Sequence, residues 1–173
     1  LKDCSFIFNT LISGGFECFA VGGCVRDSIL GKVPNDIDFT TNAKPEEIIK
    51  CFSSYDIVDI GKKYGTIAVI NNGKMYEITT YRVDGNYNDS RHPDSVSFAT
   101  ELIADLSRRD FTINAMAMDN KGNVYDYFNG QEDLKNKIIR TVGNPYQRFS
   151  EDALRIIRAI RFSSSLGFEI NKD

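Results

Sequence analysis

The sequence CFAVGGCVRDSILGKVPNDIDFTT, residues 18–41, combines a short apolar run, a double glycine and two acids spaced two residues apart. The apolar run predicts a buried strand, which Gly22 and Gly23 end. Residues 24–30 then predict a helix that a glycine closes. In residues 36–41 apolar side chains alternate with aspartates, as the two faces of a strand require. The stretch therefore predicts a strand, a glycine turn, a helix and a second strand.

The remaining segments continue to interleave helices and strands. Further helices are predicted at residues 5–15, 45–52, 100–107 and 131–137. Further strands are predicted at residues 56–60, 66–70, 75–82 and 138–142, with paired extended segments at 115–119 and 123–128. Residues 83–99 lack a clean period and predict a long mobile loop. Ser150 is expected to cap one long helix that runs to about Phe168. The fold class is therefore mixed α/β (α+β).

Length and composition narrow the class of protein. The chain has 173 residues, 42% of them hydrophobic and 26% charged, which suits one domain and at most the start of another. It lacks an apolar run long enough to span a membrane and an evident leader, so a cytoplasmic protein is expected. The net charge of −3 means that a polyanion must meet a local basic patch. Because the sequence does not begin with methionine, we expect it to be a piece of a longer protein.

Cysteine and histidine usage argues against structural metal. The sequence has four cysteines, Cys4, Cys18, Cys24 and Cys51, without a Cys-x-x-Cys spacing. The single histidine, His92, is far from them and lies in the predicted loop, where a solvated side chain is expected. The cysteines therefore predict reduced, mostly buried thiols instead of zinc ligands or disulfides.

Asp36 and Asp38 are the first candidates for chemistry. Residues two apart on a strand project from the same face, about 6–7 Å apart, so the two carboxylates repel unless a cation lies between them. Oxygen ligands of this kind suit Mg²⁺, which completes its coordination with phosphate oxygens. The alternative is a turn residue at Asp36 and a solvated strand position at Asp38.

The double glycine upstream suggests where phosphates bind. Gly22 and Gly23 open a helix and offer free backbone N–H groups, and Arg26 adds a fork-shaped donor one turn later. A phosphate-binding turn beside a carboxylate pair indicates a nucleotide. A P-loop is excluded, because Gly31-Lys32 lacks the earlier glycine and is followed by valine. Alternatively, the double glycine is only a turn.

Arginines recur in two further segments. Arg108-Arg109-Asp110 form a cationic group at a predicted helix end, where an ordinary salt bridge is the alternative explanation. Asp152 and Arg155 are three residues apart and share a helix face, which also permits a simple ion pair. Arg158 and Arg161 extend this row into a basic stripe opposite an apolar one formed by Leu154, Ile156 or Ile157, and Ile160.

Four segments together resemble the head and neck of the bacterial and eukaryotic class of tRNA nucleotidyltransferases. They are GGCVRDSILGKVPNDIDFTTNAKP (22–45), DLSRRDFTINAMA (105–117), DYFNGQEDLKNKIIRTVGNP (126–145) and EDALRIIRAIRF (151–162). That family comprises the CCA-adding enzymes and the bacterial poly(A) polymerases. The resemblance implies a nucleotidyltransferase head at 1–143, with a small mixed sheet flanked by helices, and the start of an all-helical neck at 144–173. The rest of the neck, the body and the tail lie outside this chain.

The resemblance also implies roles for individual residues. Asp36 and Asp38 match carboxylates that hold two Mg²⁺ ions, and Glu77, on a strand expected beside theirs, is a possible third acid. Residues matched to nucleotide binding are Gly22, Gly23, Arg26 and Asp27 in the turn, Arg109, Asp110 and Asn114 in the second motif, and Asp152, Arg155 and Arg158 in the last.

Base selection by Asp152 and Arg155 agrees with elementary hydrogen bonding. Cytosine and adenine both present an amino donor beside a ring-nitrogen acceptor, so a carboxylate next to a guanidinium satisfies either. Guanine and uracil place a carbonyl where the amino group should be, and that carbonyl would face the Asp152 carboxylate without a proton between them.

The function implied by the resemblance is template-independent transfer of CMP and AMP from CTP and ATP to the 3′ end of tRNA. Two Mg²⁺ ions would support the transfer without a histidine base. The tRNA would bind mainly through the missing domains, and neither a membrane nor a protein partner is implied. Two alternatives remain open: poly(A) addition by a relative with the same head, and a nucleotide-binding module without catalysis.

Overall fold

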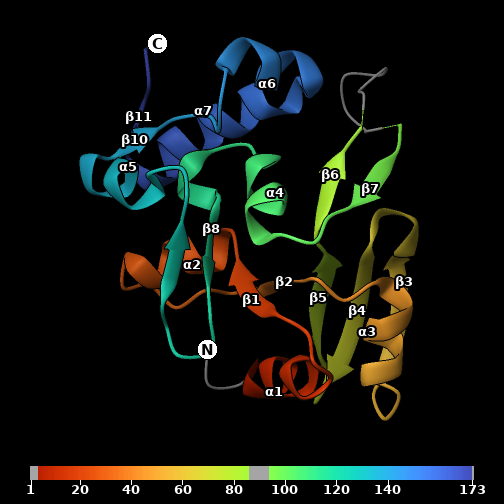
Figure 1. Ribbon diagram of the computed structural model, residues 1–173. Helices are drawn as coiled ribbons and strands as arrows, with labels where there is room; N and C mark the ends of the chain where they lie inside the picture. Colours follow the sequence, from red (N-terminus) through yellow and green to blue (C-terminus); the bar gives the residue numbers. More distant parts are fainter. Residues whose placement is uncertain (1–3, 86–93, 173) are drawn as a thin grey trace.

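A mixed sheet organises the computed structural model, which describes residues 4–85 and 94–172 (Figure 1). Within these residues the main sheet has seven strands in the order β3-β4-β5-β2-β1-β8-β9. The strands are β1 (Cys18–Val21), β2 (Asp38–Thr41), β3 (Asp56–Gly61), β4 (Thr66–Asn71), β5 (Lys74–Thr80), β8 (Met116–Met118) and β9 (Val124–Asp126). The predicted fold class, mixed α/β with a sheet flanked by helices, is confirmed.

Helices, 3₁₀ turns and two small two-stranded sheets accompany this main sheet. The α-helices are α1 (Ser5–Ser13), α2 (Gly23–Ile29), α3 (Pro45–Cys51), α4 (Leu102–Ser107), α5 (Gly130–Asn136), α6 (Pro145–Glu151) and α7 (Leu154–Leu166). Two 3₁₀ turns, η2 (Lys62–Tyr64) and η3 (Thr112–Asn114), and two small sheets, β6 (Arg82–Asp84) with β7 (Val96–Phe98) and β10 (Ile138–Ile139) with β11 (Glu169–Ile170), complete the described elements.

Register at the centre of the sheet separates a core face from a polar face. Strand β2 runs antiparallel to β1 and parallel to β5, which pairs Asp38 with Val21 on one side and with Glu77 on the other. Phe39, the next residue along β2, points the opposite way and packs edge-on against Phe8 of α1, with ring centroids 5.3 Å apart. The alternation therefore assigns Asp38 and Glu77 to the face away from α1.

On one side of the sheet, the apolar faces of α1 and α3 form the core with residues of the strands. In α1 and α3, Ile7, Leu11 and Ile48 are fully buried, and they belong to the same cluster as Ile67 and Ile78 of β4 and β5. Pro45 begins α3, where its missing N–H costs nothing, and the Glu47 side chain accepts from the Lys44 backbone N–H. This layer fixes the sheet from one side and leaves the other side for the site.

The chain ends in two helices instead of the single predicted one. Asn144 caps α6 by accepting a hydrogen bond from the Gln147 backbone N–H at 3.2 Å, and Ser150, the expected cap, lies inside α6. Asp152 is extended (φ −144°, ψ 104°), and its Oδ1 accepts from the Leu154 backbone N–H at 2.9 Å. The prediction of one helix from Ser150 was wrong because Asp152 ends one helix and caps the next.

The predicted loop 83–99 is also shorter than expected. Its described ends form the β6–β7 hairpin, in which Val83 pairs with Ser97. The predicted strand 75–82 is interrupted at Tyr81, which is buried between β5 and β6. The remainder of that loop, with His92, lies outside the described residues.

Other expectations concern the thiols, the membrane and the division of the chain. All four cysteines are free; Cys4, Cys18 and Cys24 are buried and Cys51 is half-buried, as predicted. Among the helices described, none is both long and apolar enough to cross a bilayer. Strand β11 pairs with β10, so the end of α7 is tied back to the segment before residue 143. The division into a head and a neck stays a prediction.

Candidate active site

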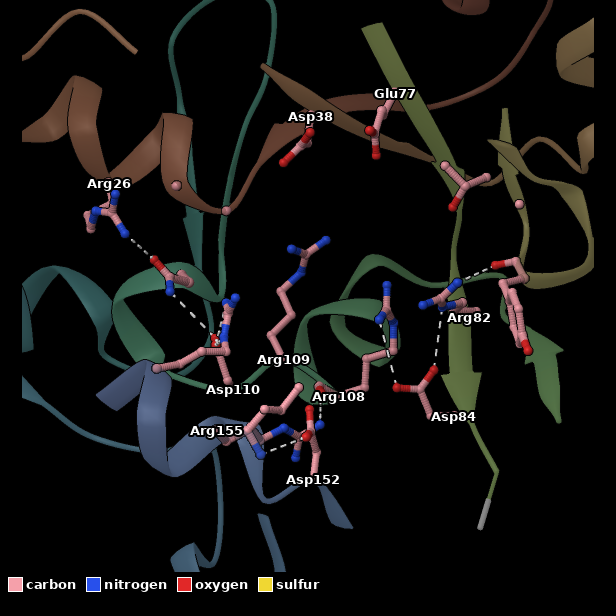
Figure 2. A pocket seen from close by; sticks show the side chains of 18 of the residues that line it. Arg26, Asp38, Glu77, Arg82, Asp84, Arg108, Arg109, Asp110, Asp152 and Arg155 are labelled. Carbon is pink, nitrogen blue, oxygen red and sulfur yellow. Dashed lines mark hydrogen bonds and ion pairs between the residues drawn. The ribbon is translucent and has the colours of Figure 1, made fainter. Parts of the chain in front are cut away.

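A cavity of about 960 Å³ opens on the polar face of the sheet, between β2 and β5 on one side and α7 on the other (Figure 2). Most of the predicted site residues line it: Gly22, Gly23, Arg26, Asp38, Glu77, Arg109, Asp110, Asn114, Asp152, Arg155 and Arg158. Asp27 and Asp36 are not among its lining residues. The fold thus gathers segments that lie more than a hundred residues apart in the sequence.

The carboxylates Asp38 and Glu77 occupy matching positions on adjacent parallel strands. Partial burial raises the pKa of Asp38; the nearby Arg109 guanidinium opposes this effect and Asp36 adds to it. Partial burial and the charges of Asp38 and Asp36 likewise raise the pKa of Glu77. The structure therefore confirms that Glu77 lies beside the carboxylate strand, and mutual repulsion makes this edge of the sheet a site for positive charge.

Asp36 differs from its predicted position. Strand β2 begins at Asp38, so Asp36 lies in the extended segment before the strand and is not the first member of a strand pair. Its charge still acts on both Asp38 and Glu77. The three carboxylates have the donor chemistry that Mg²⁺ prefers, which is one or two carboxylates completed by phosphate oxygens. In residues 4–85 and 94–172 they do not converge into a ready-made metal cage.

The glycine turn packs closely against Arg109, which with Arg26 and Arg158 forms what we term the arginine wall of the cavity. Gly22 has φ +81°, and a Cβ at this position would lie 3.3 Å from Nη1 of Arg109. Its backbone N–H donates to the Met116 carbonyl at 3.2 Å, so the prediction that this N–H is free for a phosphate was wrong. Glycine is needed here because an L side chain disfavours this φ and would crowd the guanidinium.

Arg26 lies beside the turn and contacts residues of three elements. Its Nε donates to Asp27 Oδ1 and its Nη1 donates to Asn114 Oδ1, both at 2.8 Å. The guanidinium also lies 5.2 Å from the centre of the Phe162 ring, and the residue is 9% exposed. Arg26 therefore joins α2 to η3 and α7 at the edge of the cavity.

Arg109 projects toward the carboxylates from the end of α4 (Figure 2). Its Nη2 donates to Asp105 Oδ2 at 3.1 Å, whereas its buried Nε has no hydrogen-bond partner among the described residues. Asp105 is fully buried, and although burial opposes ionisation, Arg109 and Arg108 hold its pKa below the usual range. The hydroxyl of Thr40 on β2 also donates to Asp105, at 3.2 Å. This buried carboxylate fixes Arg109 relative to the sheet.

Asp110 links the second motif to α7. Its Oδ1 accepts from the Phe111 backbone N–H at 2.8 Å, and Oδ2 accepts from Arg158 Nε at 2.7 Å. The Asn114 amide reaches the same carboxylate at 3.5 Å. The predicted cluster of Asp110, Asn114 and Arg158 is therefore brought together, and Asp110 is its hub.

Asp152 and Arg155 both line the cavity but do not form the ion pair that their spacing permits. Arg155 Nη1 donates to Glu151 Oε2 at 2.8 Å, and Asp152 uses Oδ1 to cap α7. Burial opposes ionisation of Glu151, but hydrogen bonds from Arg155 and the charge of Arg148 lower its pKa. Glu151, four residues before Arg155, is thus a carboxylate partner of Arg155, which also donates to the carbonyl oxygens of Arg148 and Arg108.

Helix α7 turns the side that carries Arg155 toward the rest of the molecule, and its apolar stripe points away. Arg155, Ala159 and Phe162 are buried, and the Phe162 ring meets Phe111 edge-on with centroids 5.8 Å apart. The apolar side chains of the other face are exposed: Leu154, Ile156, Ile157 and Ile160. The guanidinium groups of Arg26 and Arg158 lie over the Phe162 ring, 5.2 and 5.4 Å from its centre, which stabilises positive charge on this side of the helix.

Sequence reasoning missed several residues that line the cavity. Arg82 and Asp84 lie on β6, and Arg108 links them to the buried acid by contacts of 3.8 Å to Asp84 and 2.9 Å to Asp105. Further missed lining residues are Ile60, Gly61, Tyr64, Thr66, Met75 and Phe162, and Arg161 of the predicted basic stripe also lines the cavity.

Comparison with known proteins identifies the class. The model of the poly A polymerase head domain matches residues 18–140, and the chain belongs to this family. Among curated relatives, the CCA-adding enzyme of Oceanobacillus iheyensis is 54% identical over 167 residues, which is 96% of this chain and 41% of the relative. The CCA-adding enzyme of Lactobacillus helveticus is 51% identical over 96% of this chain. This chain thus spans about two fifths of the length of the relatives it matches.

Solved structures give the same result. The Bacillus stearothermophilus CCA-adding enzyme in complex with CTP superposes with a TM-score of 0.90 at 43% identity, over 99% of this chain and 41% of that one. The Thermotoga maritima CCA-adding enzyme complexed with tRNA superposes with a TM-score of 0.78 at 28% identity, over 99% and 39% of the two chains. The nucleotidyltransferase head architecture is therefore confirmed.

Proposed function

We propose that the protein transfers CMP and AMP from CTP and ATP to the 3′ end of tRNA. The observation that carries the proposal is the pairing of Asp38 with Glu77 opposite a wall of arginines, in a chain about half identical to CCA-adding enzymes. Relatives solved with CTP and with tRNA support both kinds of substrate. We also propose that the protein acts in the cytoplasm.

The carboxylate edge is the proposed site of metal. Asp38 and Glu77, with Asp36 beside them, would hold Mg²⁺, which would activate the acceptor hydroxyl and offset charge on the leaving pyrophosphate. Burial, and to a lesser extent the charges of neighbouring acids, raise the pKa values of Asp38 and Glu77, and a bound cation would favour the ionised form of both.

The arginine wall is the proposed triphosphate site. Arg109 has an unpartnered Nε and approaches both the carboxylates and Gly22. Asp110 and Asn114 hold the neighbouring Arg158 and Arg26, so the wall is fixed before a nucleotide arrives. Preorganised cations of this kind stabilise phosphoryl transfer because they need not be reoriented during the reaction.

Asp152 and Arg155 are the proposed base-reading pair. Both line the cavity together with the arginines, and only Oδ1 of the Asp152 carboxylate accepts the capping bond from Leu154. A carboxylate acceptor beside a guanidinium donor matches the amino and ring-nitrogen groups of cytosine and adenine. We further propose that residues 144–173 begin a neck, and that the tRNA binds mostly to parts of the protein outside this chain.

Poly(A) addition is the second candidate, because the matching family model describes a poly A polymerase head. The decisive experiment supplies full-length protein with each of the four nucleoside triphosphates and tRNA lacking its terminal CCA. Addition of two C and one A supports the proposal, whereas long runs of A on any RNA would assign polyadenylation. Binding of nucleotide without incorporation would assign a non-catalytic module.

A further inference from the structure

Two Asn-Gly dipeptides occur in the sequence, Asn72-Gly73 and Asn129-Gly130, and neither lines the cavity. Both asparagines have a left-handed backbone, with φ 50° at Asn72 and φ 60° at Asn129. Asparagine is a thermolabile residue, and a following glycine has no Cβ to shield its backbone nitrogen from the asparagine side chain. The two dipeptides match in sequence and in the φ of the asparagine, so their surroundings decide how they differ.

Asn72 and Gly73 form the whole turn between β4 and β5. Asn71 pairs with Lys74, and Gly73 has φ +74°, which gives the two-residue turn that Asn-Gly favours. Both turn residues are exposed, and a Cβ at Gly73 would meet no atom within 4 Å. Within residues 4–85 and 94–172, no acceptor is found for the Gly73 N–H. The Gly73 nitrogen is therefore open to the side chain that precedes it.

The peptide between Asn129 and Gly130 is instead held at both its nitrogen and its oxygen. Gly130 is buried, and its N–H donates to Asp126 Oδ1 at 2.9 Å. The Asn129 carbonyl accepts from the Asp133 backbone N–H at 3.0 Å, in the first turn of α5. This peptide cannot rotate or release its nitrogen unless the start of α5 opens.

Deamidation requires the glycine nitrogen to attack the asparagine side chain. The nitrogen gives its proton to water and forms a bond to Cγ, while the bond from Cγ to Nδ2 breaks and Nδ2 takes up a proton and leaves as ammonia. Water then opens the resulting succinimide at either carbonyl, which gives aspartate or isoaspartate. The attack needs a free nitrogen and rotation of the asparagine backbone, and a hydrogen bond to the nitrogen opposes both.

We propose that Asn72 is a site of spontaneous deamidation in the folded protein, and that Asp126 and α5 protect Asn129 from the same reaction. The residues that must move with the Asn72 side chain, Gly73 and Lys74, are exposed. The isoaspartyl product lengthens the turn by one backbone atom and adds a negative charge at the start of β5, the strand that carries Glu77. This inference does not depend on the proposed function.

The test follows both dipeptides in one sample of folded, full-length protein. Trypsin releases them in separate peptides, residues 64–74 and 122–135, and mass spectrometry measures the replacement of amide by acid in each. Asn72 should convert roughly 10- to 150-fold faster than Asn129, the factor by which a hydrogen bond to a charged group slows release of the Gly130 nitrogen. Equal rates in the folded protein would overturn the inference.

Unfolding separates the effect of the fold from that of the dipeptide. In 6 M urea the two asparagines should convert at rates within about threefold of each other, because both then lie in an open chain. Folded protein should convert Asn72 at no less than about a tenth of its rate in urea, since little structure must open at the turn. A larger slowing at Asn72 would show that the turn protects it, and would also overturn the inference.

Substitutions at Asp126 test the protection. Asp126→Ala removes the acceptor of the Gly130 N–H and should speed conversion at Asn129 without changing the rate at Asn72. Asp126→Asn keeps an oxygen acceptor and is the matched control, in which Asn129 should stay protected. An unchanged rate at Asn129 in folded Asp126→Ala would contradict the protective role of this carboxylate.

A substitution at Asn72 assigns the converted residue. Asn72→Gln would have to close a larger ring, so the peptide of residues 64–74 should remain unconverted although Asn71 is still present. Conversion of that peptide at the parental rate would assign the reaction to Asn71 and would overturn the inference.

Discussion

Asp38 receives opposing influences from its surroundings. Partial burial and the Asp36 charge favour its neutral form, whereas Arg109 favours the ionised form. The same carboxylate is paired in register with Glu77 on the next strand. At neutral pH the ionised carboxylates therefore destabilise the empty site, and a bound cation would stabilise it. Such a loss of stability in favour of binding is typical of a functional position.

Asp38→Asn should abolish nucleotide incorporation and leave the fold intact. Loss of the proposed metal ligand should cost more than the roughly 100-fold that loss of an outer-shell partner costs. Because the amide carries no charge, melting without Mg²⁺ should occur at the same temperature or higher. Calorimetry with and without Mg²⁺ checks this: the ion should raise the Tm of the parent more than that of the variant. Equal Tm increases would contradict the role in metal binding.

Glu77→Gln should change the pH dependence of stability with a definite sign. The pKa of Glu77 is raised in the folded protein, so the folded state holds this proton more tightly than the unfolded state does. Its contribution to stability is present below the unfolded pKa of about 4.3 and is lost as the pH rises through the folded value. The variant, measured without divalent ions, should therefore gain Tm relative to the parent between about pH 4 and pH 7. A constant difference across this interval would contradict a pKa of Glu77 that folding raises through burial and the charges of Asp38 and Asp36.

Asp105→Asn should destabilise the protein by about 3 kcal/mol, since it removes a buried charge that two arginines share. The pKa of Asp105 is lowered, so this contribution is present above the unfolded value and is lost as the pH falls. Urea denaturation at pH 7 measures the loss. Glu132→Gln on exposed α5 is the control and should change stability by less than about 0.5 kcal/mol. Equal effects of the two substitutions would contradict the anchoring role of Asp105.

At the residue scale, the sequence predicted which side chains gather but not how they pair. Asp38, Arg109, Asp110 and Asn114 all line one cavity, as expected. The partner of Arg155 was missed because Asp152, three residues away, was considered and Glu151, four residues away, was not. Asp36 was placed on a strand because alternation alone does not mark where a strand begins.

At the scale of elements, most strand and helix starts before residue 80, with β2 as an exception, were predictable because local signals agree with tertiary packing. Gly22, Pro45 and the hairpin glycine Gly73 each favour the conformation that they adopt. The break between α6 and α7 could not be predicted from periodicity, since the arginine-rich pattern continues through it. Only the capping bond from Leu154 to Asp152 decides the boundary.

Gly130→Ala tests how α5 supports the site. A Cβ at Gly130 would lie against the Thr112 carbonyl and 3.0 Å from Met116 Cγ, so η3 would have to move. The expected cost is about 1–3 kcal/mol, as for overpacking in a core. Because η3 also carries Asn114, CTP binding should weaken as well. Thermal unfolding and CTP titration are the measurements, with the exposed Gln131→Ala as the control; a Tm within about 1 °C of the parent would contradict this packing, since 1 kcal/mol shifts Tm by roughly 2–8 °C.

At the scale of the molecule, thiol reactivity should report global opening. Cys4, Cys18 and Cys24 are buried, and burial raises the pKa of Cys24 to about 11. Cys51 is half-buried, so a thiol reagent at pH 8 should label it at least about tenfold faster than the others. Mass spectrometry after timed labelling gives the four rates. Their convergence in 6 M urea, and only there, would agree with a single cooperative unit.

The pairing of Val21 with Asp38 and of Asp38 with Glu77 has a consequence for refolding. A slip of one residue in β2 would turn Asp38 toward α1 and expose Phe39, and Gly22 would lose its alignment with the acids. The register therefore fixes the positions of Asp38, Glu77 and Gly22 together, so a molecule has all three in place or none of them. The fraction of molecules that bind nucleotide in a refolded sample would then equal the fraction in which β2 has its native register.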